Sequence, residues 1–327
     1  MRKTGSLIFF ATDVHGSERC FKKFLRAADA YGAGTLILGG DITGKWLAPI
    51  LAQSDGTWKA RFLERDWVAR STGELEELKA RVSASGYYPY LTDARGLAEL
   101  ERDPERLEDV FLQLMLESVR GWLLAAREIL GGTGVKCFVS PGNDDRPEID
   151  ALLRESEGAE GRGGVVSNPD GTKVWLDEDH EMISLGWGNP TPWNCPRDLS
   201  EEELGARIDR LAATVERMDN CVFNFHIPPY DTVIDQAPKL DDNLRPRLQP
   251  GGGLEMAPAG SIAVRRAIEK YQPLLGLHGH IHESKGFCRI GRTLCVNPGS
   301  EYTEGILKGF LFKLGRGKVD QYLFTSG

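Results

Sequence analysis

Half of the histidines in this 327-residue chain lie within five residues of one another. The stretch LHGHIHES (277–284) places His278, His280 and His282 at alternate positions, while the whole chain has six histidines. Four polar motifs precede it in the sequence: Asp13-Val-His15, Gly40-Asp41, Gly142-Asn143-Asp144-Asp145 and the single His226. Imidazole, carboxylate and amide groups all bind metal ions, so these motifs indicate a metal centre.

The donor types indicate which chemistry such a centre would perform. Two aspartates, one asparagine and four histidines supply too many imidazoles for a calcium site and too many oxygens for a structural zinc site. This number of ligands fits two divalent ions that share one carboxylate. Two ions roughly 3.5–4 Å apart suit the hydrolysis of phosphate esters, because they polarise the phosphoryl oxygens and lower the pKa of a bound water from about 15.7 toward ~7.

Each motif follows a short apolar run that predicts a β-strand. These runs cover 6–11, 35–40, 136–140, 220–225 and 273–279. Helix-period sequence separates them, including residues 18–31 and a helix before residue 220 that starts with a capping box, Ser200 to Glu203. Continuous apolar strands between helices indicate a sheet covered on both faces. Ligands bind at the carboxyl ends of such strands, which is where the motifs lie.

The spacing within two of the motifs supports a shared target. Asp13 and His15 are two residues apart, as are His280 and His282. In an extended segment, side chains two residues apart lie on the same side. Each pair can therefore face one metal centre.

Two segments interrupt the alternation of strands and helices. Residues 46–134 are charged and helix-periodic, including a long helix over 107–130, and predict a helical insertion between the second and third strands of one domain spanning 1–327. Residues 231–260 are rich in proline and glycine and could form an active-site loop. Near the end of the chain, 287–296 and 307–324 alternate and turn at glycines, as antiparallel hairpins do.

The five motifs, Asp-x-His, Gly-Asp, Gly-Asn, a lone His and Gly-His-x-His in this order, resemble the calcineurin-like metallophosphoesterase superfamily. The resemblance runs from Asp13 to His282 and leaves out the insertion. It implies an α/β fold, the four-layer αββα sandwich of metallo-dependent phosphatases, with metal ions at the strand ends. It also implies seven metal ligands: Asp13, His15, Asp41 and His282 for a first ion, and Asn143, His226, His280 and the bridging Asp41 for a second.

The same resemblance implies catalytic roles for Asp41, Asn143, Asp144 and His226, and substrate contacts from Asn143. The chain departs from the family's fuller motif, Gly-Asn-His-Asp/Glu, whose histidine commonly contacts the phosphate or protonates the leaving group. Asp144 stands at that position here. A carboxylate repels a dianionic phosphate unless it is protonated or turned away. We therefore expect little help for poor leaving groups and a slight preference for phosphodiesters.

The two residues that follow Asp144 have possible supporting roles. Asp145 stands where the family has an acidic residue and could orient a neighbour. Arg146 could donate two parallel N–H hydrogen bonds to a substrate phosphate, although a surface arginine at the start of a helix fits the same position.

Two further segments have alternative interpretations. GGDITGKW (39–46) nearly matches the phosphate loop GxxxxGK[ST], but Trp46 replaces the required hydroxyl and Asp41 would bring a carboxylate into the phosphate cradle. We reject that match. WGNPTPWNC (187–195) concentrates two tryptophans and two prolines, and could either wall a substrate pocket or simply pack; the sequence leaves both open.

The two remaining histidines are not expected to bind metal. His278 falls within a predicted strand, where a packed or supporting role is favoured over ligation. His180 lies in the acidic stretch DEDHE, which predicts a solvated loop residue.

Composition narrows the class of protein and its partners. A formal net charge of −8 argues against the broad basic surface that nucleic acids or anionic membranes require. The apolar run 7–11 is too short for a secretory signal, and no stretch approaches the ~20 apolar residues of a membrane span. Six widely spaced cysteines without a CxxC motif indicate reduced thiols, so a cytoplasmic location is expected. The oligomeric state stays open.

The sequence therefore predicts a binuclear metal-dependent phosphoesterase that uses a metal-bound hydroxide on a small phosphate ester. Imidazole and carboxylate ligands accept manganese, iron, zinc or similar ions, so the sequence does not specify the metal. Alternatives are a phosphomonoesterase or protein phosphatase of the same fold, a nuclease, and a metal-binding scaffold without turnover. The scaffold is disfavoured because none of the seven ligands is missing. A nuclease is disfavoured because the chain, with a net charge of −8, shows no broad basic surface for the phosphate backbone.

Overall fold

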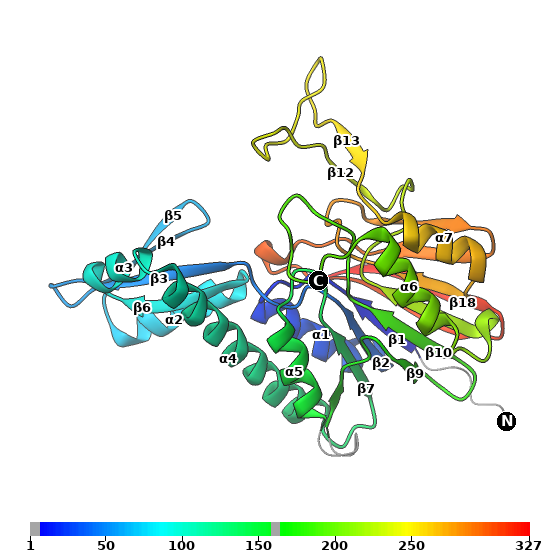
Figure 1. Cartoon of the computed structure of the whole chain (residues 1–327). Helices are drawn as coiled ribbons and strands as arrows, with labels where there is room; N and C mark the ends of the chain where they lie inside the picture. Colours follow the sequence, from blue (N-terminus) through cyan, green and yellow to red (C-terminus); the bar gives the residue numbers. More distant parts are fainter. Residues whose placement is uncertain (1–6, 158–163) are drawn as a thin grey trace.

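The computed structural model describes residues 7–157 and 164–327, and it is built around two six-stranded sheets (Figure 1). The first sheet has the order β18-β17-β1-β2-β7-β8. Its strands are β1 (Leu7–Ala11), β2 (Ala33–Gly39), β7 (Lys136–Ser140), β8 (Val166–Ser167), β17 (Lys308–Gly315) and β18 (Lys318–Ser326). The α/β class predicted from the sequence is confirmed.

The second sheet has the order β15-β16-β14-β11-β10-β9. Its strands are β9 (Lys173–Trp175), β10 (Glu181–Leu185), β11 (Cys221–Phe225), β14 (Leu275–Leu277), β15 (Gly286–Ile290) and β16 (Thr293–Asn297). Four neighbouring strands of each sheet are parallel: β1, β2, β7 and β8 in the first, and β10, β11, β14 and β16 in the second. The two predicted C-terminal hairpins form as β15–β16 and β17–β18.

The five strands expected before the polar motifs all form. β7 has the predicted bounds, and the others agree within two residues at either end, with Ser6 of the first lying outside the described residues. Ile8 and Phe10 of β1 pack with Val222 and Leu275 of the second sheet, so one apolar core lies between the two sheets. Phe9, between them in sequence, packs on the opposite face. Burial on both faces explains why these runs are continuously apolar.

Helices cover the outer faces of both sheets. α1 (Glu18–Tyr31), α4 (Pro104–Leu130) and α5 (Pro147–Ser156) share an apolar cluster with β1, β2 and β7. α6 (Glu201–Ala212) and α7 (Ile262–Tyr271) share another with β10 and β11. The predicted helix 18–31 and the capping box of Ser200 and Glu203 are confirmed. Two short 3₁₀ turns, Met218–Asn220 and Tyr302–Glu304, complete these elements.

The expectation of a purely helical segment at 46–134 is wrong. It contains a four-stranded sheet of β3 (Trp46–Ala52), β4 (Trp58–Phe62), β5 (Arg65–Ala69) and β6 (Tyr87–Thr92), together with α2 (Thr72–Ala84), α3 (Ala94–Glu101) and α4. β4 and β5 are short and carry charged residues: in β4, only Ala60 and Phe62 are buried. A sequence with such weak alternation forms a strand only when it pairs and packs with neighbouring elements. Here these elements enclose a separate small apolar core.

Residues 231–260 are not wholly irregular. Within them, β12 (Gln236–Pro238) and β13 (Met256–Pro258) pair as an antiparallel ribbon. The chain between them extends away from the sheets (Figure 1), and we call residues 236–258 the arm.

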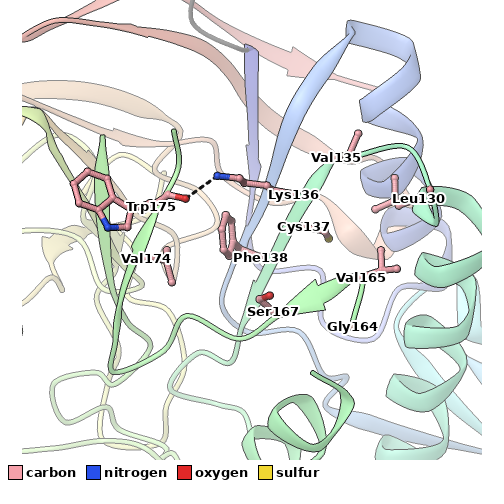
Figure 2. A pocket seen from close by; sticks show the side chains of 12 residues that line it. Leu130, Val135, Lys136, Cys137, Phe138, Gly164, Val165, Ser167, Val174 and Trp175 are labelled. Atoms are coloured by element: carbon pink, nitrogen blue, oxygen red, sulfur yellow. Dashed lines mark hydrogen bonds between the residues drawn. The ribbon is translucent and has the colours of Figure 1, made fainter. Parts of the chain in front are cut away.

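At the start of β7, a cavity of about 420 Å³ lies beside Trp175, whose carbonyl accepts a hydrogen bond from Lys136 Nζ (Figure 2). Within the described residues, no helix is both long and apolar enough to cross a membrane.

Candidate metal centre

The polar motifs of the two sheets meet at the carboxyl ends of their parallel strands. Asp13, Asp41 and Asn143 follow β1, β2 and β7 of the first sheet, whereas His226 follows β11 and His280 follows β14 of the second. Six of the seven predicted ligands fall into two groups in which the ligand atoms all lie within 4.8 Å of one another. One group is Asp13, His15 and His282, and the other is Asp41, His226 and His280.

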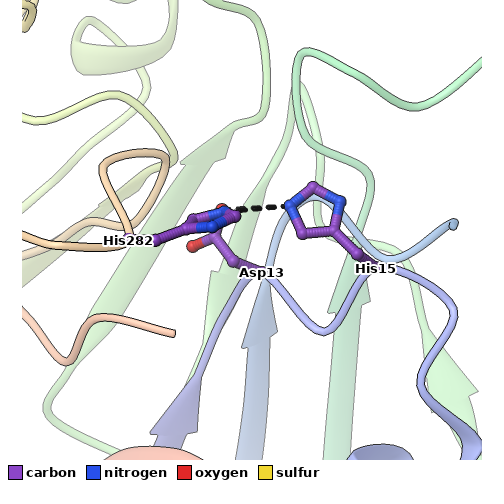
Figure 3. A group of neighbouring side chains, drawn as sticks. All are labelled: Asp13, His15 and His282. Carbon is purple, nitrogen blue, oxygen red and sulfur yellow. Dashed lines mark hydrogen bonds and ion pairs between the residues drawn. The ribbon is translucent and has the colours of Figure 1, made fainter. Parts of the chain in front are cut away.

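The first group joins the beginning and the end of the chain. His282 Nε2 lies 3.5 Å from Asp13 Oδ1 and 3.0 Å from His15 Nε2 (Figure 3). His15 Nε2 is 3.9 Å from Asp13 Oδ1. The backbone N–H of His280 donates to both carboxylate oxygens of Asp13, at 3.1 and 3.0 Å. Asp13 thereby fixes the position of the loop that carries the last two histidines.

Asp41 belongs to the second group and also lies close to His15 of the first. Its Oδ1 is 3.3 Å from His226 Nε2, while its Oδ2 is 3.7 Å from His15 Nε2. The backbone N–H of Asp144 donates to Oδ1 at 3.1 Å and holds the carboxylate in this orientation. A carboxylate whose two oxygens face different imidazoles has the geometry that a bridging ligand requires.

Two buried polar atoms point into the site without a hydrogen bond. Asn143 Nδ2 donates to Asp198 Oδ1 at 3.0 Å, which leaves the buried Oδ1 of Asn143 without a partner among the described residues. His226 Nδ1 lies 3.1 Å from the carbonyl of Gly39 and donates to it, so Nε2 carries the lone pair when the ring is neutral. That Nε2 likewise makes no hydrogen bond of acceptable geometry within the part of the chain that the structure describes. A buried acceptor without a donor costs free energy unless a cation binds it.

The backbone at the site is held in a sparsely populated conformation. Asp13, His15, Asp41 and His280 all have positive φ, at 52°, 39°, 49° and 66°. Side chains other than glycine rarely adopt these angles, and the cost is about 1–3 kcal/mol at each position. Strain at four candidate ligands indicates that the fold holds these loops for function rather than for stability.

Asp145 and a neighbouring glycine hold these loops in place. The carboxylate of Asp145 accepts from the backbone N–H groups of Ile42, Thr43 and Gly142, at 2.9, 2.8 and 2.7 Å. The expectation that Asp145 orients a neighbour thus has a structural basis. Gly40, at φ 125°, packs so closely that a Cβ there would lie 2.4 Å from His226 Nδ1. The Gly-Asp motif therefore needs its glycine for the imidazole to fit.

The electrostatics of the site favour a bound cation. Burial opposes a charged imidazole at His226, but the carboxylates of Asp41 and Asp13 outweigh it and raise the pKa of His226 to about 9. Burial and the proximity of His226 lower the pKa of His280 to about 4, and burial with Lys45 lowers that of His15 to about 3. Neutral imidazoles have a free lone pair for a metal ion, and the whole donor set is compatible with divalent ions.

Searches for related proteins give a fold rather than a family. No family model matches the chain. The uncharacterized protein MJ1162 of Methanocaldococcus jannaschii is 31% identical over 128 residues, which is 38% of this chain and 51% of that protein. The chain thus matches about half the length of this curated relative.

The chain shares its fold with the protein TT1561 of Thermus thermophilus. That structure is 16% identical, with a TM-score of 0.54 over 99% of both chains. A second solved structure, also 16% identical, reaches a TM-score of 0.58 over 99% of this chain and 98% of its own. A dimetal phosphatase from Danio rerio is 10% identical over 98% of this chain and 99% of its own, and its TM-score of 0.44 is too low to support a conclusion.

Asp144 is paired with a lysine that the sequence interpretation passed over. Lys45 Nζ lies 2.9 Å from Asp144 Oδ2. Burial opposes a charge on Lys45, but Asp41 and Asp144 outweigh it and raise its pKa, so the ammonium stays protonated. The carboxylate of Asp144 is therefore half of an ion pair beside Asp41. GGDITGKW is no phosphate loop, yet its lysine reaches the site.

Arg146 does not join the site. Its guanidinium pairs with Glu108 of α4, and Arg146 is the residue that precedes the first turn of α5. The structure gives no support to a phosphate contact from this side chain. The second interpretation from the sequence, a surface arginine at the start of a helix, agrees with its position before α5.

The two other histidines are structural in this geometry. His278 is buried, and its Nδ1 lies 2.8 Å from the carbonyl of Phe225 and 3.1 Å from that of Ile227, so it braces β14 against the end of β11. His180 is also buried, between Asp177 and the carbonyl of Gly315. The expectation of a solvated His180 is wrong, because its acidic neighbour accepts its ring hydrogen bond.

A cavity of about 820 Å³ opens onto the metal centre. Asp41, Asn143, His280 and His282 line one part of it, together with Lys45 and Asp144. Residues 189–193, Cys195 and residues of the arm line most of the rest. Of the two interpretations left open for segment 187–195, Trp193 fits the pocket wall, whereas Trp187 packs beneath the guanidinium groups of Arg197 and Arg207. Residues 231–260 also contribute to this cavity.

Proposed function

We propose that this chain is a metal-dependent phosphoesterase of the calcineurin-like metallophosphoesterase superfamily, with two divalent ions and a slight preference for phosphodiesters. The observation that carries the proposal is the position of Asp41, whose carboxylate oxygens face His226 of its own group and His15 of the Asp13–His15–His282 group. The facing sheets with helices outside support a four-layer αββα sandwich. The packing of α4 on the first sheet supports one domain over 1–327 with an insertion at 46–134.

The residues present fit two metal ions. In the proposal, Asp13, His15, Asp41 and His282 hold one ion, and Asp41, Asn143, His226 and His280 hold the other. The unpaired Asn143 Oδ1 and His226 Nε2 support this, because both are buried acceptors directed at the site. Manganese, iron or zinc would polarise a phosphoryl oxygen and lower the pKa of a bound water when present in this donor set.

The side chains around the ligands position the substrate. Lys45 takes the role first considered for Arg146: its ammonium binds a phosphoryl oxygen, and the hydrogen bond to Asp144 keeps Nζ beside Asp41. Asp198 orients the amide of Asn143. Asp145 holds the loops of Asp41 and Asn143 together through three backbone N–H groups.

The ion pair of Lys45 and Asp144 also bears on the choice of ester. A phosphodiester carries one negative charge and a phosphomonoester up to two, so a carboxylate at position 144 disfavours the monoester more. Asp144 offers no proton to the leaving group while it is ionised and paired with Lys45. Both effects favour a diester with a good leaving group.

The experiment compares bis-p-nitrophenyl phosphate with p-nitrophenyl phosphate. The protein is stripped of metal and then given manganese, iron, zinc, nickel or magnesium in turn. Turnover that returns with one ion and is faster on the diester supports the proposal. Faster monoester turnover would overturn the diester preference and favour a phosphomonoesterase or protein phosphatase. Two bound ions without turnover of either ester would favour a metal-binding scaffold.

The remaining parts of the proposal rest on the sequence. A small-molecule phosphate ester is the expected partner rather than a macromolecule, since the net charge of −8 offers no broad surface for nucleic acid. A cytoplasmic location is proposed from the six widely spaced cysteines.

A further inference from the structure

The cavity above the metal centre is much larger than a phosphate group needs. Its volume is about 820 Å³, within the range of pockets that enclose whole organic ligands. The candidate metal ligands and Lys45 occupy only part of its lining. The remaining lining lies where the rest of a phosphate ester would extend.

That remaining lining is predominantly apolar. It is formed by Trp193 and flanking prolines on one side, and by Leu240, Leu244 and Pro246 of the arm on the other. Apolar side chains that line a cavity beside a polar centre bind the apolar part of a ligand, because burial of both surfaces releases water. The lining thus matches an organic group larger than a methyl or ethyl ester.

The charged groups in this outer part already have partners or face solvent. Lys239 Nζ lies 2.7 Å from Glu255 Oε1. Glu201 accepts from Ser261 Oγ and from the backbone N–H of Ala263, and so caps the start of α7. Glu283 is exposed. The charged residues of the outer lining therefore give no reason to expect a second charge on the ligand.

Trp193 is a large exposed ring with a fixed backbone. It is 63% exposed, and within residues 7–157 and 164–327 it stacks on no other aromatic ring or cation. Asp198 fixes its loop: Oδ2 accepts from the backbone N–H groups of Thr191 and Cys195, at 2.9 and 3.0 Å. The other oxygen of Asp198 accepts from Asn143. One carboxylate thus sets the place of Trp193 relative to a candidate metal ligand.

We propose that the ligand of this cavity is a phosphate ester whose organic part is large and uncharged and carries a planar aromatic ring that stacks on Trp193. The inference rests on the proposed function for the position of the phosphate. The ring stacks on the indole, while Leu240 and Leu244 of the arm cover its other side. A stacked ring of this kind contributes about tenfold or more to affinity.

The test measures binding without turnover, by calorimetry on the manganese-loaded protein. The probes are methylphosphonate, phenylphosphonate and hexylphosphonate, which share the anionic group and have a P–C bond in place of the ester bond. We expect phenylphosphonate to bind about tenfold more tightly than the other two. Trp193→Ala should bring the phenyl-to-methyl ratio of affinities close to one.

Two matched controls separate this cavity from general effects. Trp175 is 40% exposed and lines the separate cavity at the start of β7 (Figure 2), so Trp175→Ala should leave the ratio unchanged. On the arm, Leu244 lines the large cavity whereas Leu248 is 71% exposed and does not. Leu244→Ser should therefore lower the ratio and Leu248→Ser should not.

The outcomes distinguish this inference from the proposed hydrolysis. Equal affinities for the three phosphonates, or tighter binding of hexylphosphonate that Trp193→Ala does not change, would overturn the aromatic ligand. Turnover of bis-p-nitrophenyl phosphate is measured on the same samples. A phenyl preference without turnover would reject the hydrolase and keep the ligand class, and turnover without a phenyl preference would do the reverse.

Discussion

The ring nitrogens of His15 and His282 face each other at 3.0 Å between Nε2 atoms, although the residues are 267 positions apart in sequence (Figure 3). His15 Nδ1 lies 3.3 Å from the carbonyl of Thr43, which accepts a hydrogen bond from it. The Nε2 of a neutral His15 is then an acceptor. Two imidazoles in this arrangement are stabilised when a cation lies between their lone pairs.

Metal ions should therefore stabilise the fold. A ligand that binds only the folded state adds about 2.7 kcal/mol to the free energy of unfolding at 100 times its Kd. We expect manganese or zinc to raise the Tm of the stripped protein by several degrees and a chelator to reverse the shift. Differential scanning calorimetry measures this. An unchanged Tm at saturating metal would argue against a binding site.

Asp41→Asn should abolish turnover and reduce metal content. The amide keeps the shape of the side chain but removes the negative charge between the two groups, so we expect loss of at least one ion and a decrease in turnover of more than about 100-fold. Elemental analysis and the diester assay measure these. Without metal the Tm should also fall, because burial opposes the charge of Asp41 but His226, His15 and Lys45 outweigh it and lower its pKa, so the ionised carboxylate stabilises the stripped protein. Asp242→Asn, on the exposed arm, is the control and should change neither quantity.

Replacement by alanine should lower metal content at His226 and the free energy of unfolding at His278. His226→Ala removes an unpaired Nε2 at the site and should lower metal content. His278→Ala removes the hydrogen bonds to Phe225 and Ile227 and should lower the free energy of unfolding by roughly 1–3 kcal/mol while the metal content is kept. Urea denaturation and elemental analysis give the two readouts. Loss of metal from the His278 variant at unchanged stability would make His278 a ligand.

Lys45→Met should weaken substrate binding more than metal binding. In the proposed function the ammonium binds the phosphate, and its removal would also leave Asp144 without its ion-pair partner beside that anion, so KM should rise by roughly 10–100-fold. Lys45→Arg should restore part of the loss. Competition by inorganic phosphate measures the anion site independently of turnover. The exposed Lys59→Met is the control, and an unchanged KM in Lys45→Met would remove this role.

Glu181 should make stability depend on pH in the acid range. Burial opposes its ionisation, but hydrogen bonds from Lys173 Nζ and the backbone N–H of Arg217 outweigh it and lower the pKa of Glu181 below the usual 4.5. A folded-state pKa below the unfolded one gives stability that is present above pH 4.5 and lost as pH falls through the folded value. The difference in unfolding free energy between wild type and Glu181→Gln should shrink from about pH 7 to about pH 3. A constant difference would contradict this.

Much of the fold could be predicted from the sequence because its central strands are buried on both faces. β1 is continuously apolar and β7 and β11 are largely so, and such buried runs specify strands with little reference to their neighbours. The insertion behaves differently. β4 has only two buried side chains, and its pairing with β3 and β5 decides its structure. Weak patterns of this kind depend on tertiary partners.

The sequence by itself determined the candidate ligands, because their residue types follow strand after strand in a fixed order from Asp13 to His282. Only the tertiary structure decided which side chains act beside them. It directs Arg146 to Glu108 and brings Lys45 to Asp144, and it ties Trp193 to Asn143 through Asp198. Ligand motifs are local, since each lies at the end of one strand. The contacts around them join residues as far as 287 positions apart, such as Asp13 and Ser300, and folding alone brings such residues together.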